Sequence, residues 1–254
     1  MSGGPGRVSL VGAGPGDPEL VTLKAARRLA EADVVLYDAL VTAETLALAG
    51  RATRICVGKR AGRPGTSQEA IHAIMIRAAR RGRRVVRLKC GDPFVLGRGG
   101  EESQALARAG VPCEVVPGVS AAVAAPALAG IPVTHRGLAS AFVVVSGHAE
   151  SAYRPLLESM APHAATIVVL MGKGTRADVA TLLLARGWAR DTPSAVLLGA
   201  STPAERSWLG PLCSLATARI QEDGLPGTIV IGEVVALAET DAGLAGALPV
   251  SQAR

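Results

Sequence analysis

The fold is indicated by residues 8–20, Val8-Ser9-Leu10-Val11-Gly12-Ala13-Gly14-Pro15-Gly16-Asp17-Pro18-Glu19-Leu20. A short apolar run ends in a glycine-rich loop, and apolar residues at helical spacing follow as far as Glu31. A strand that passes through a tight loop into a helix is the start of a βαβ unit, whose strands are parallel. The stretch therefore predicts an α/β fold with a candidate ligand site at the carboxyl end of its first strand.

Strand and helix patterns alternate over most of the chain. The helix with the clearest signals begins with a capping box formed by Thr66 and Glu69 and ends at Arg80-Arg81-Gly82. Other helices are expected at residues 20–31, 101–109, 118–129, 175–186 and 212–222. Strands are expected at residues 8–11, 34–37, 55–57, 85–88, 114–116, 142–145, 167–170, 195–198, 207–209 and 229–231.

The order of these patterns predicts two α/β lobes. We expect an N-terminal lobe over residues 1–118, with a mostly parallel sheet, and a C-terminal lobe over residues 119–240. Strands close together in the second half of the sequence favour a mixed sheet there. The last residues, 241–254, are expected to form a flexible tail.

Composition restricts the classes of protein to consider. The chain has 254 residues, of which 49% are hydrophobic but only 2% aromatic, so an aliphatic core is expected and general disorder is excluded. With so few aromatic side chains there is no stacking platform for single-stranded nucleic acid.

Neither a secretory leader nor a membrane span is expected, because no apolar run has the necessary length. The four cysteines are scattered, which argues against a zinc site or a disulfide framework and favours the cytoplasm.

The charge balance points to an anionic small molecule. The chain carries 27 basic and 21 acidic residues, and only four of the basic residues are Lys. The planar arginine guanidinium pairs well with carboxylates and phosphates, which favours a polyanionic substrate. A GC-rich genome explains the same preference for Arg. No run of five like charges occurs, so no nucleic-acid partner is expected.

Glycine-rich turns follow three of the expected strands, at residues 12–18, 90–100 and 117–121. Because parallel strands present their carboxyl ends at one edge, these turns outline one crevice for a small molecule. The first turn resembles a dinucleotide fingerprint, but the spacing of its glycines is wrong and Pro15 lacks an N–H for a pyrophosphate. A tight turn that needs glycine for its backbone conformation is the simpler interpretation of this loop alone.

Several motifs, in order, resemble the uroporphyrinogen-III C-methyltransferases, a family of the tetrapyrrole methylase superfamily. The resemblance runs from about Arg7 to Ala238. The glycine turn at residues 11–18 is common to the superfamily, whereas three other motifs are more specific to this family: Tyr37-Asp38, residues 98–102 (Arg-Gly-Gly-Glu-Glu) and Thr134-His135-Arg136. The remaining motifs are Val57-Gly58-Lys59-Arg60, residues 87–93, residues 117–121 and Leu170-Met171-Gly172.

The resemblance implies a two-lobed homodimer that binds S-adenosylmethionine in a cleft between the lobes and releases S-adenosylhomocysteine. It implies methylation of uroporphyrinogen III at ring carbons C2 and C7, giving precorrin-2 for cobalamin or sirohaem. It assigns the roles of proton acceptor and proton donor to Asp38 and Lys59. Arg98 and Glu101 are also implied to take part in catalysis. These two residues, together with Arg136, would contact the substrate. The implied cofactor contacts are Pro15, Cys90, Gly91, Asp92, Val95, Ser120, Ala121, Met171, Ala200 and Thr228. No metal is implied.

The chemistry of the implied reaction fits these residue types. Transfer of a methyl group from a sulfonium is an in-line displacement, in which the protein supplies alignment and electrostatics. The acetate and propionate arms of the substrate account for arginines around the cleft, Arg98 and Arg136 first, with Arg60 and Arg63 as further candidates. The chain departs from the family at Cys90 and Ala200, where Gly is usual, and at Leu96, where Phe is usual.

Other interpretations compete with this one. Asp38 is a suitable cap for a helix over residues 40–49, and Lys59 is a suitable solvated surface lysine. A methylase of a later corrin intermediate shares the superfamily motifs, as do methylases of protein or rRNA. A nicotinamide oxidoreductase and a non-catalytic binding module are the alternatives from other classes. The motifs at 98–102 and 134–136 favour uroporphyrinogen III as the substrate.

Overall fold

The computed structural model describes residues 6–58, 65–220 and 224–238, and the chain forms two compact units, Met1–Ser120 and Ala121–Arg254. Each unit is described by itself. Lys59, Arg60 and Arg63, as well as the expected tail at 241–254, lie outside the described residues.

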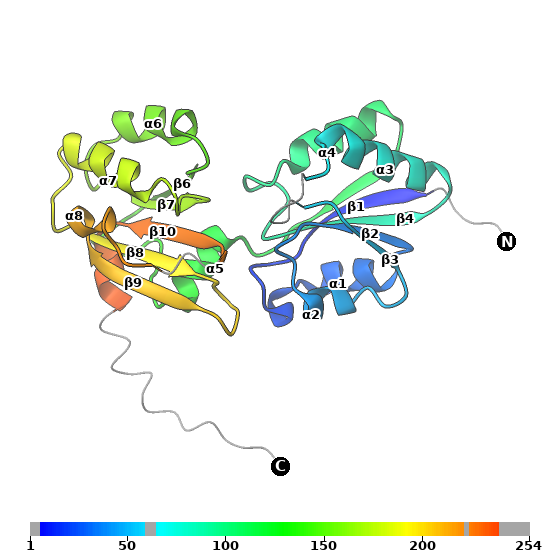
Figure 1. Cartoon of the computed structure of the whole chain (residues 1–254), viewed down its shortest axis with the longest axis horizontal. Coiled ribbons are helices and arrows are strands. Elements are labelled where there is room, and N and C mark those ends of the chain that lie inside the picture. The colour runs from blue at the N-terminus through cyan, green and yellow to red at the C-terminus, as the bar shows by residue number, and fades with distance from the viewer. Residues whose placement is uncertain (1–5, 59–64, 221–223, 239–254) are drawn as a thin grey trace, which may run out of the picture. The chain divides into compact units, whose positions relative to one another are not determined.

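The first unit is built on a parallel five-stranded sheet with strand order β3-β2-β4-β1-β5. Helices α1 (Leu23–Ala30) and α2 (Ala43–Ala47) cover one face, and α3 (Gln68–Arg80) and α4 (Gly99–Arg108) cover the other (Figure 1). The strands are β1 (Arg7–Gly12), β2 (Val34–Tyr37), β3 (Thr53–Cys56), β4 (Arg84–Lys89) and β5 (Cys113–Val116).

Side chains alternate between the two faces of this sheet. Val11 and Leu88 pack with α1 and α2, whereas Leu10 and Val85 pack with α3 and α4. Because helices cover both faces, the central strands are buried on both sides, and their buried residues are mainly aliphatic, with Arg87 and Lys89 of β4 as charged exceptions. Strands β4, β1 and β5 are neighbours and run parallel, so their carboxyl ends lie side by side at one edge of the sheet.

The helix starts differ from expectation at two places. Ser67 rather than Thr66 caps α3, because its hydroxyl accepts the N–H of Ala70. Thr42, not Asp38, caps α2 by accepting the N–H of Thr45. The helix-cap interpretation of Asp38 is therefore wrong, and its carboxylate serves another contact.

The second unit contains a mixed five-stranded sheet with order β6-β7-β10-β8-β9. Only β6 and β7 pair in parallel, and the other pairs are antiparallel. Helices α6 (Glu150–Ser159), α7 (Arg176–Ala185) and α8 (Leu212–Leu215) pack on one face, and α5 (Ala121–Leu128) and the short 3-10 helix η2 (Glu233–Ala236) on the other (Figure 1). The strands are β6 (Phe142–Ser146), β7 (Thr166–Leu170), β8 (Pro193–Leu198), β9 (Arg206–Pro211) and β10 (Gly227–Ile231).

The predicted class of fold, α/β with one parallel and one mixed sheet, is confirmed. Helix α6 was not predicted, because it contains Pro155 and has no side-chain cap at its start. The helix expected at 212–222 is confirmed at its start but was predicted too long, because α8 ends at Leu215 after a single turn. Among the described residues, none of the helices is both long and apolar enough to cross a bilayer.

Glu114, on edge strand β5, joins three elements of the first unit. Its carboxylate accepts bonds from Arg28 and Lys24 of α1 and, at 2.8 Å, from the Ser9 hydroxyl of β1. The hydrogen bond from Arg28 is the main reason that the pKa of Glu114 falls to about 2, from the 4.5 of a free glutamate. A carboxyl whose pKa falls on folding stabilises the folded state as long as it is ionised.

The Glu114→Gln variant is therefore expected to lose about 1–2 kcal/mol of unfolding free energy near neutral pH. The loss is smaller than the pKa shift alone would give, because partial exposure to solvent screens the ion pairs. The contribution is fully present above pH 4.5 and disappears as the pH falls through about 2. Chemical denaturation of both proteins between pH 2 and 7 measures this. Glu19→Gln, which removes an exposed carboxylate outside the ion pairs of the described residues, is the control. A difference that is constant with pH would contradict the pairing.

Candidate active site

Three turns meet at the carboxyl edge of the first sheet. Gly14 and Gly91 exchange backbone hydrogen bonds of 3.2 and 2.7 Å, which join the loop after β1 to the loop after β4. Both residues have positive φ, 74° and 66°, a conformation that glycine adopts without strain. The first two of the three turns are therefore in direct contact, and the crevice expected there stays a prediction.

Gly12 and Gly118 explain why side chains are absent at this junction. A Cβ on Gly12 would lie 2.5 Å from the Cα of Gly118 and 2.5 Å from the carbonyl oxygen of Gly91. A Cβ on Gly118 would lie 2.3 Å from that same oxygen. Because all these neighbours are backbone atoms, they cannot move aside, and glycine is required at both positions.

Asp92 clamps the same junction. One carboxylate oxygen accepts the N–H of Phe94 at 2.8 Å, and the other accepts the N–H of Gly118 at 3.0 Å. The second bond links the turn after β4 to the turn after β5. Each oxygen keeps one lone pair for a further donor, so a cofactor contact is compatible with this clamping role.

The other predicted cofactor residues of this unit lie along the same edge. Pro15 is buried in the first turn, and Cys90 and Ser120 are half-buried in the second and third. The Cys90 thiol lies 3.8 Å from the carbonyl oxygen of Gly14. Burial is the main cause that raises the pKa of this thiol, and the charge of Asp38 adds to the effect.

Asp38, directly after β2, is joined to a buried arginine. Arg87 Nη2 donates to Asp38 Oδ1, and Arg87 Nε donates at 3.0 Å to Glu102 Oε1. The side chains of Arg87 and Glu102 are 3% and 0% exposed, whereas that of Asp38 is 30% exposed. The three residues form a connected path from helix α4 through β4 to the surface at the end of β2.

Two more side chains complete this charge cluster. Lys89 Nζ and Gln68 Nε2 donate to the same Glu102 oxygen, at 3.2 and 3.1 Å. Burial is the main cause that lowers the pKa of Lys89, and the positive charge of Arg87 lowers it further. No described residue bonds the second carboxylate oxygen of Glu102.

The sequence analysis missed Arg87, Lys89 and Glu102 as candidate site residues. The signal was present: Arg87 and Lys89 alternate with apolar residues in a strand that is buried on both faces. Charged side chains at such positions must be partnered inside the protein. A buried acidic partner was therefore to be expected somewhere in the fold, and Glu102 of α4 supplies it.

Arg98 and Glu101 form a separate, exposed pair at the start of α4. The guanidinium donates two bonds to the carboxylate, of 2.9 and 2.7 Å, and these bonds raise the pKa of Arg98 and lower that of Glu101. Arg98 and Leu96 have positive φ, 60° and 54°, in the loop that also carries exposed Val95. A residue with a side chain is strained in this left-handed backbone conformation, and such strain is often retained at functional sites.

In the second unit, three predicted cofactor residues gather at one edge of the mixed sheet. Met171 follows the end of β7 and Ala200 follows the end of β8, while Thr228 is near the start of β10 between these two strands. Met171 is 52% exposed and has a φ of 58°. Ala121, the fourth residue, begins α5, which packs on β7 and β10.

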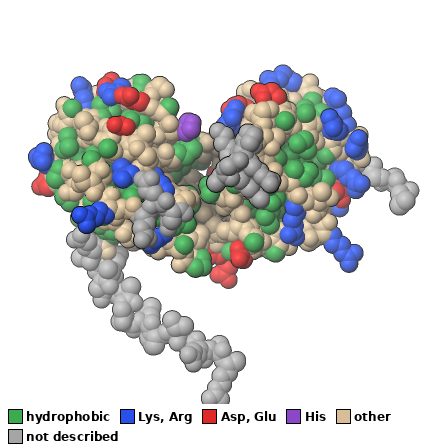
Figure 2. Space-filling model, viewed as in Figure 1, with side chains coloured by type: hydrophobic (Ala, Val, Ile, Leu, Met, Phe, Trp, Pro, Cys, Tyr) green, Lys and Arg blue, Asp and Glu red, His purple; other side chains and the backbone are tan. Residues whose placement is uncertain are grey.

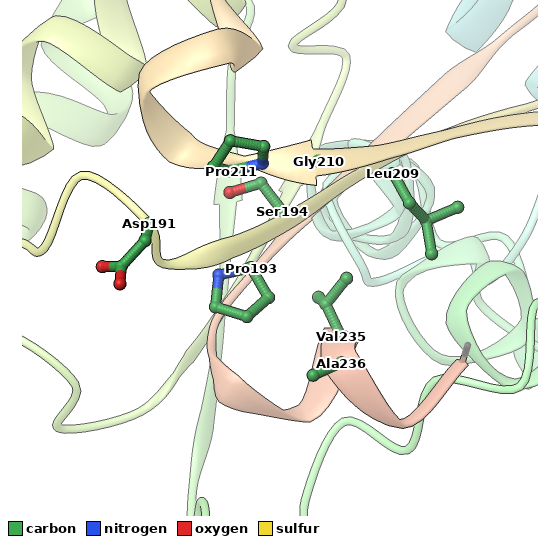
Figure 3. Close-up of a pocket in the computed structure, with 8 residues that line it drawn as sticks. All are labelled: Asp191, Pro193, Ser194, Leu209, Gly210, Pro211, Val235 and Ala236. Atoms are coloured by element: carbon green, nitrogen blue, oxygen red, sulfur yellow. The ribbon is translucent and has the colours of Figure 1, made fainter. Parts of the chain in front are cut away.

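Two surface hollows lie in the second unit. Arg136 lines one of them, in the loop after α5, beside Thr134 and His135. The other, between β8, β9 and η2, contains none of the predicted site residues (Figure 3). Its lining is mostly apolar, and the Asp191 carboxylate is directed away from Leu209 and Val235 (Figure 3).

Basic side chains are scattered on the face of the molecule drawn in Figure 2. There the described Lys and Arg side chains of each unit stand in small groups, with hydrophobic, acidic and other surface between them (Figure 2). This distribution differs from the continuous basic stripe that is typical of nucleic-acid-binding proteins.

Curated proteins of similar sequence match most of this chain. The siroheme synthase of Neisseria meningitidis serogroup B is 51% identical over 237 residues, which cover 92% of this chain but 49% of that protein. The chain thus spans about half the length of the curated relatives it matches.

Two solved structures are similar over most of this chain. A uroporphyrin-III C-methyl transferase from Thermus thermophilus, complexed with S-adenyl homocysteine, is 47% identical, with a TM-score of 0.79 over 91% of this chain and 100% of that one. A cobalt precorrin-4 methyltransferase is 30% identical, with a TM-score of 0.78 over 90% of this chain and 95% of that one.

A family model describes most of the chain. Residues 7–216 match the model for tetrapyrrole (corrin/porphyrin) methylases, a range that includes every predicted site residue except Thr228. This match and the similar structures confirm the resemblance drawn from the motifs. The chain belongs to the tetrapyrrole (corrin/porphyrin) methylases.

Proposed function

We propose that this chain transfers methyl groups from S-adenosylmethionine to C2 and C7 of uroporphyrinogen III, giving precorrin-2 for sirohaem or cobalamin synthesis. The observation that carries the proposal is the likeness to the Thermus uroporphyrin-III C-methyl transferase over 91% of this chain and 100% of that one, at 47% identity and a TM-score of 0.79. That protein's complex with S-adenyl homocysteine supports the choice of methyl donor.

The turns of the first unit suit such a donor. Gly12 and Gly118 let the turns after β1, β4 and β5 contact one another through main-chain atoms, and these contacts fix the loops that carry the proposed donor residues. The donor contacts proposed in this unit are Pro15, Cys90, Gly91, Asp92, Val95 and Ser120. Those proposed in the second unit are Ala121, Met171, Ala200 and Thr228.

The substrate end of the reaction is assigned to charged side chains. Arg98, Glu101 and Arg136 bind the acidic macrocycle, with Arg98 exchanging its bonds to Glu101 for bonds to substrate carboxylates. The bound sulfonium supplies an electrophilic methyl group and leaves with the electron pair of its C–S bond. The ring carbon forms the new C–C bond, and the substrate then loses one proton, which Asp38 accepts at its carboxylate. The resemblance assigns proton donation to Lys59.

Two rival functions fit the observations less well. A methylase of a later corrin intermediate is supported by the precorrin-4 enzyme, but that enzyme is 30% identical and the uroporphyrin-III enzyme 47%. A nicotinamide oxidoreductase requires a dinucleotide fingerprint, which the first turn lacks.

We propose further that the protein acts as a homodimer in the cytoplasm. The family resemblance supports the homodimer, and the scattered cysteines support the cytoplasm.

The direct test is an assay of the purified chain. With uroporphyrinogen III and S-adenosylmethionine, we expect a product heavier by two methyl groups, together with S-adenosylhomocysteine, as measured by mass spectrometry. Precorrin-2 that is supplied as the substrate in a separate assay should be recovered unchanged. Tight NADH binding without S-adenosylhomocysteine binding would instead support the oxidoreductase.

Gly12→Ala tests the junction of the turns. Its new Cβ would force apart backbone segments that lie 2.5 Å from that position, so S-adenosylhomocysteine affinity is expected to fall about tenfold or more. Gly174→Ala is the matched control, because a Cβ there meets nothing within 4 Å. Isothermal titration calorimetry compares the two. Equal affinities in both variants would remove the junction from the donor site.

Arg98→Ala tests the proposed substrate contact. We expect kcat/KM for uroporphyrinogen III to fall by about a hundredfold, while S-adenosylhomocysteine affinity stays within about twofold. Arg154→Ala is the control, because Arg154 forms similar exposed pairs, with Glu150 and Glu158 in the second unit. Steady-state kinetics and calorimetry supply both values. Full activity in Arg98→Ala would refute the assignment.

A further inference from the structure

Glu102 is the most deeply buried charged residue of the described chain, with a relative exposure of 0%. Its Oε1 accepts from Arg87, Lys89 and Gln68, at 3.0, 3.2 and 3.1 Å. Its neighbour Glu101 points outward and pairs with Arg98, so the two adjacent glutamates face different environments. The role assigned to Glu101 therefore does not extend to Glu102.

The contacts of Glu102 converge on one cation that is shared with Asp38. Arg87 reaches Glu102 through Nε and Asp38 through Nη2, and Nη1 donates to the Leu88 carbonyl at 3.2 Å. A guanidinium is planar, so fixing Nε and Nη1 fixes the direction in which Nη2 points. Glu102 thereby determines where Arg87 offers its hydrogen bond to Asp38.

Electrostatics lead to the same conclusion. Arg87 and Lys89 are buried cations, and Glu102 is the buried anion that compensates them. Without that anion, Asp38 would be the remaining carboxylate among the hydrogen-bond partners of Arg87. Asp38 would then be drawn toward the buried cations and away from the surface, where a substrate meets it.

We propose that Glu102 is a positioning residue for methyl transfer, holding the Asp38 carboxylate in its reactive orientation through Arg87. The inference rests on the proposed function, because Asp38 is taken there as the proton acceptor. Glu102 itself does not touch the substrate, since it is enclosed by α3, α4 and β4. Among the described residues nothing donates to the second oxygen of Asp38, which leaves that oxygen to accept the substrate proton.

A double-mutant cycle tests this coupling. The variants are Glu102→Gln, Asp38→Asn and the two combined, each assayed for kcat and KM with uroporphyrinogen III. In the wild-type background, Glu102→Gln is expected to lower kcat about tenfold or more and to leave KM within about twofold. In the Asp38→Asn background, the same change is expected to lower kcat by less than about twofold, because the group it positions is gone. Glu102→Asp keeps the charge and should recover part of the lost rate.

Glu114→Gln is the matched control, because it removes another paired carboxylate of the same unit, far along the sequence from Asp38. It should lose stability but keep kcat. Equal losses of kcat from Glu102→Gln in both backgrounds would overturn the inference and leave Glu102 with a purely structural role. If Glu102→Gln does not fold, Glu102→Asp replaces it in the cycle, with the same criterion of non-additivity.

The test also separates this inference from the proposed function. A wild-type chain that binds S-adenosylhomocysteine but leaves uroporphyrinogen III unmethylated would refute the proposed substrate. In that case the cycle is measured in thermal unfolding midpoints. Non-additive shifts for Glu102 and Asp38 would then support the coupling, and additive shifts would overturn it.

Discussion

The close approach of three backbone segments at the carboxyl ends of β1, β4 and β5 is the constraint on which the rest of this site depends. Gly12, Gly91 and Gly118 touch through main-chain atoms, and the Asp92 carboxylate ties two of the turns together. Because the contacts are made by backbone atoms and hydrogen bonds, they fix the three turns relative to one another. The exposed loop that carries Val95 and Arg98 starts from this junction.

A second constraint lies beneath the first. Strand β4 is central in its sheet, yet it directs Arg87 and Lys89 into the layer between the sheet and α3 and α4. Burying two cations is costly unless anions and hydrogen bonds compensate them. Glu102, Asp38 and Gln68 provide this compensation, and the cluster links the core to a partly exposed carboxylate at the edge of the sheet. A stable core would not need these charges, which is why they point to function.

The sequence predicted the elements whose signals are local. Strand β2 and the apolar cores of β4 and β10 follow from short aliphatic runs, and the glycine turns follow from their composition. Helix α6 was missed because it lacks a cap and contains a proline, and the length of α8 was overestimated because apolar spacing continues beyond its single turn. The Arg87–Glu102 contact was not predicted, because it joins a strand to a helix, and pairing across elements depends on how they pack. Motif resemblance supplied Asp38 and Arg98 but gave no sign that one is tied to the core and the other to a surface partner.

Cys90 has a consequence for the durability of such an enzyme. Its thiol sits in the turn after β4, where we place the methyl donor, and sulfur nucleophiles attack sulfonium methyl groups when they are ionised. Burial and the neighbouring carboxylate raise the pKa of this thiol, so the neutral form prevails. A methyl donor bound as proposed would therefore meet a neutral thiol, which is a much weaker nucleophile than a thiolate.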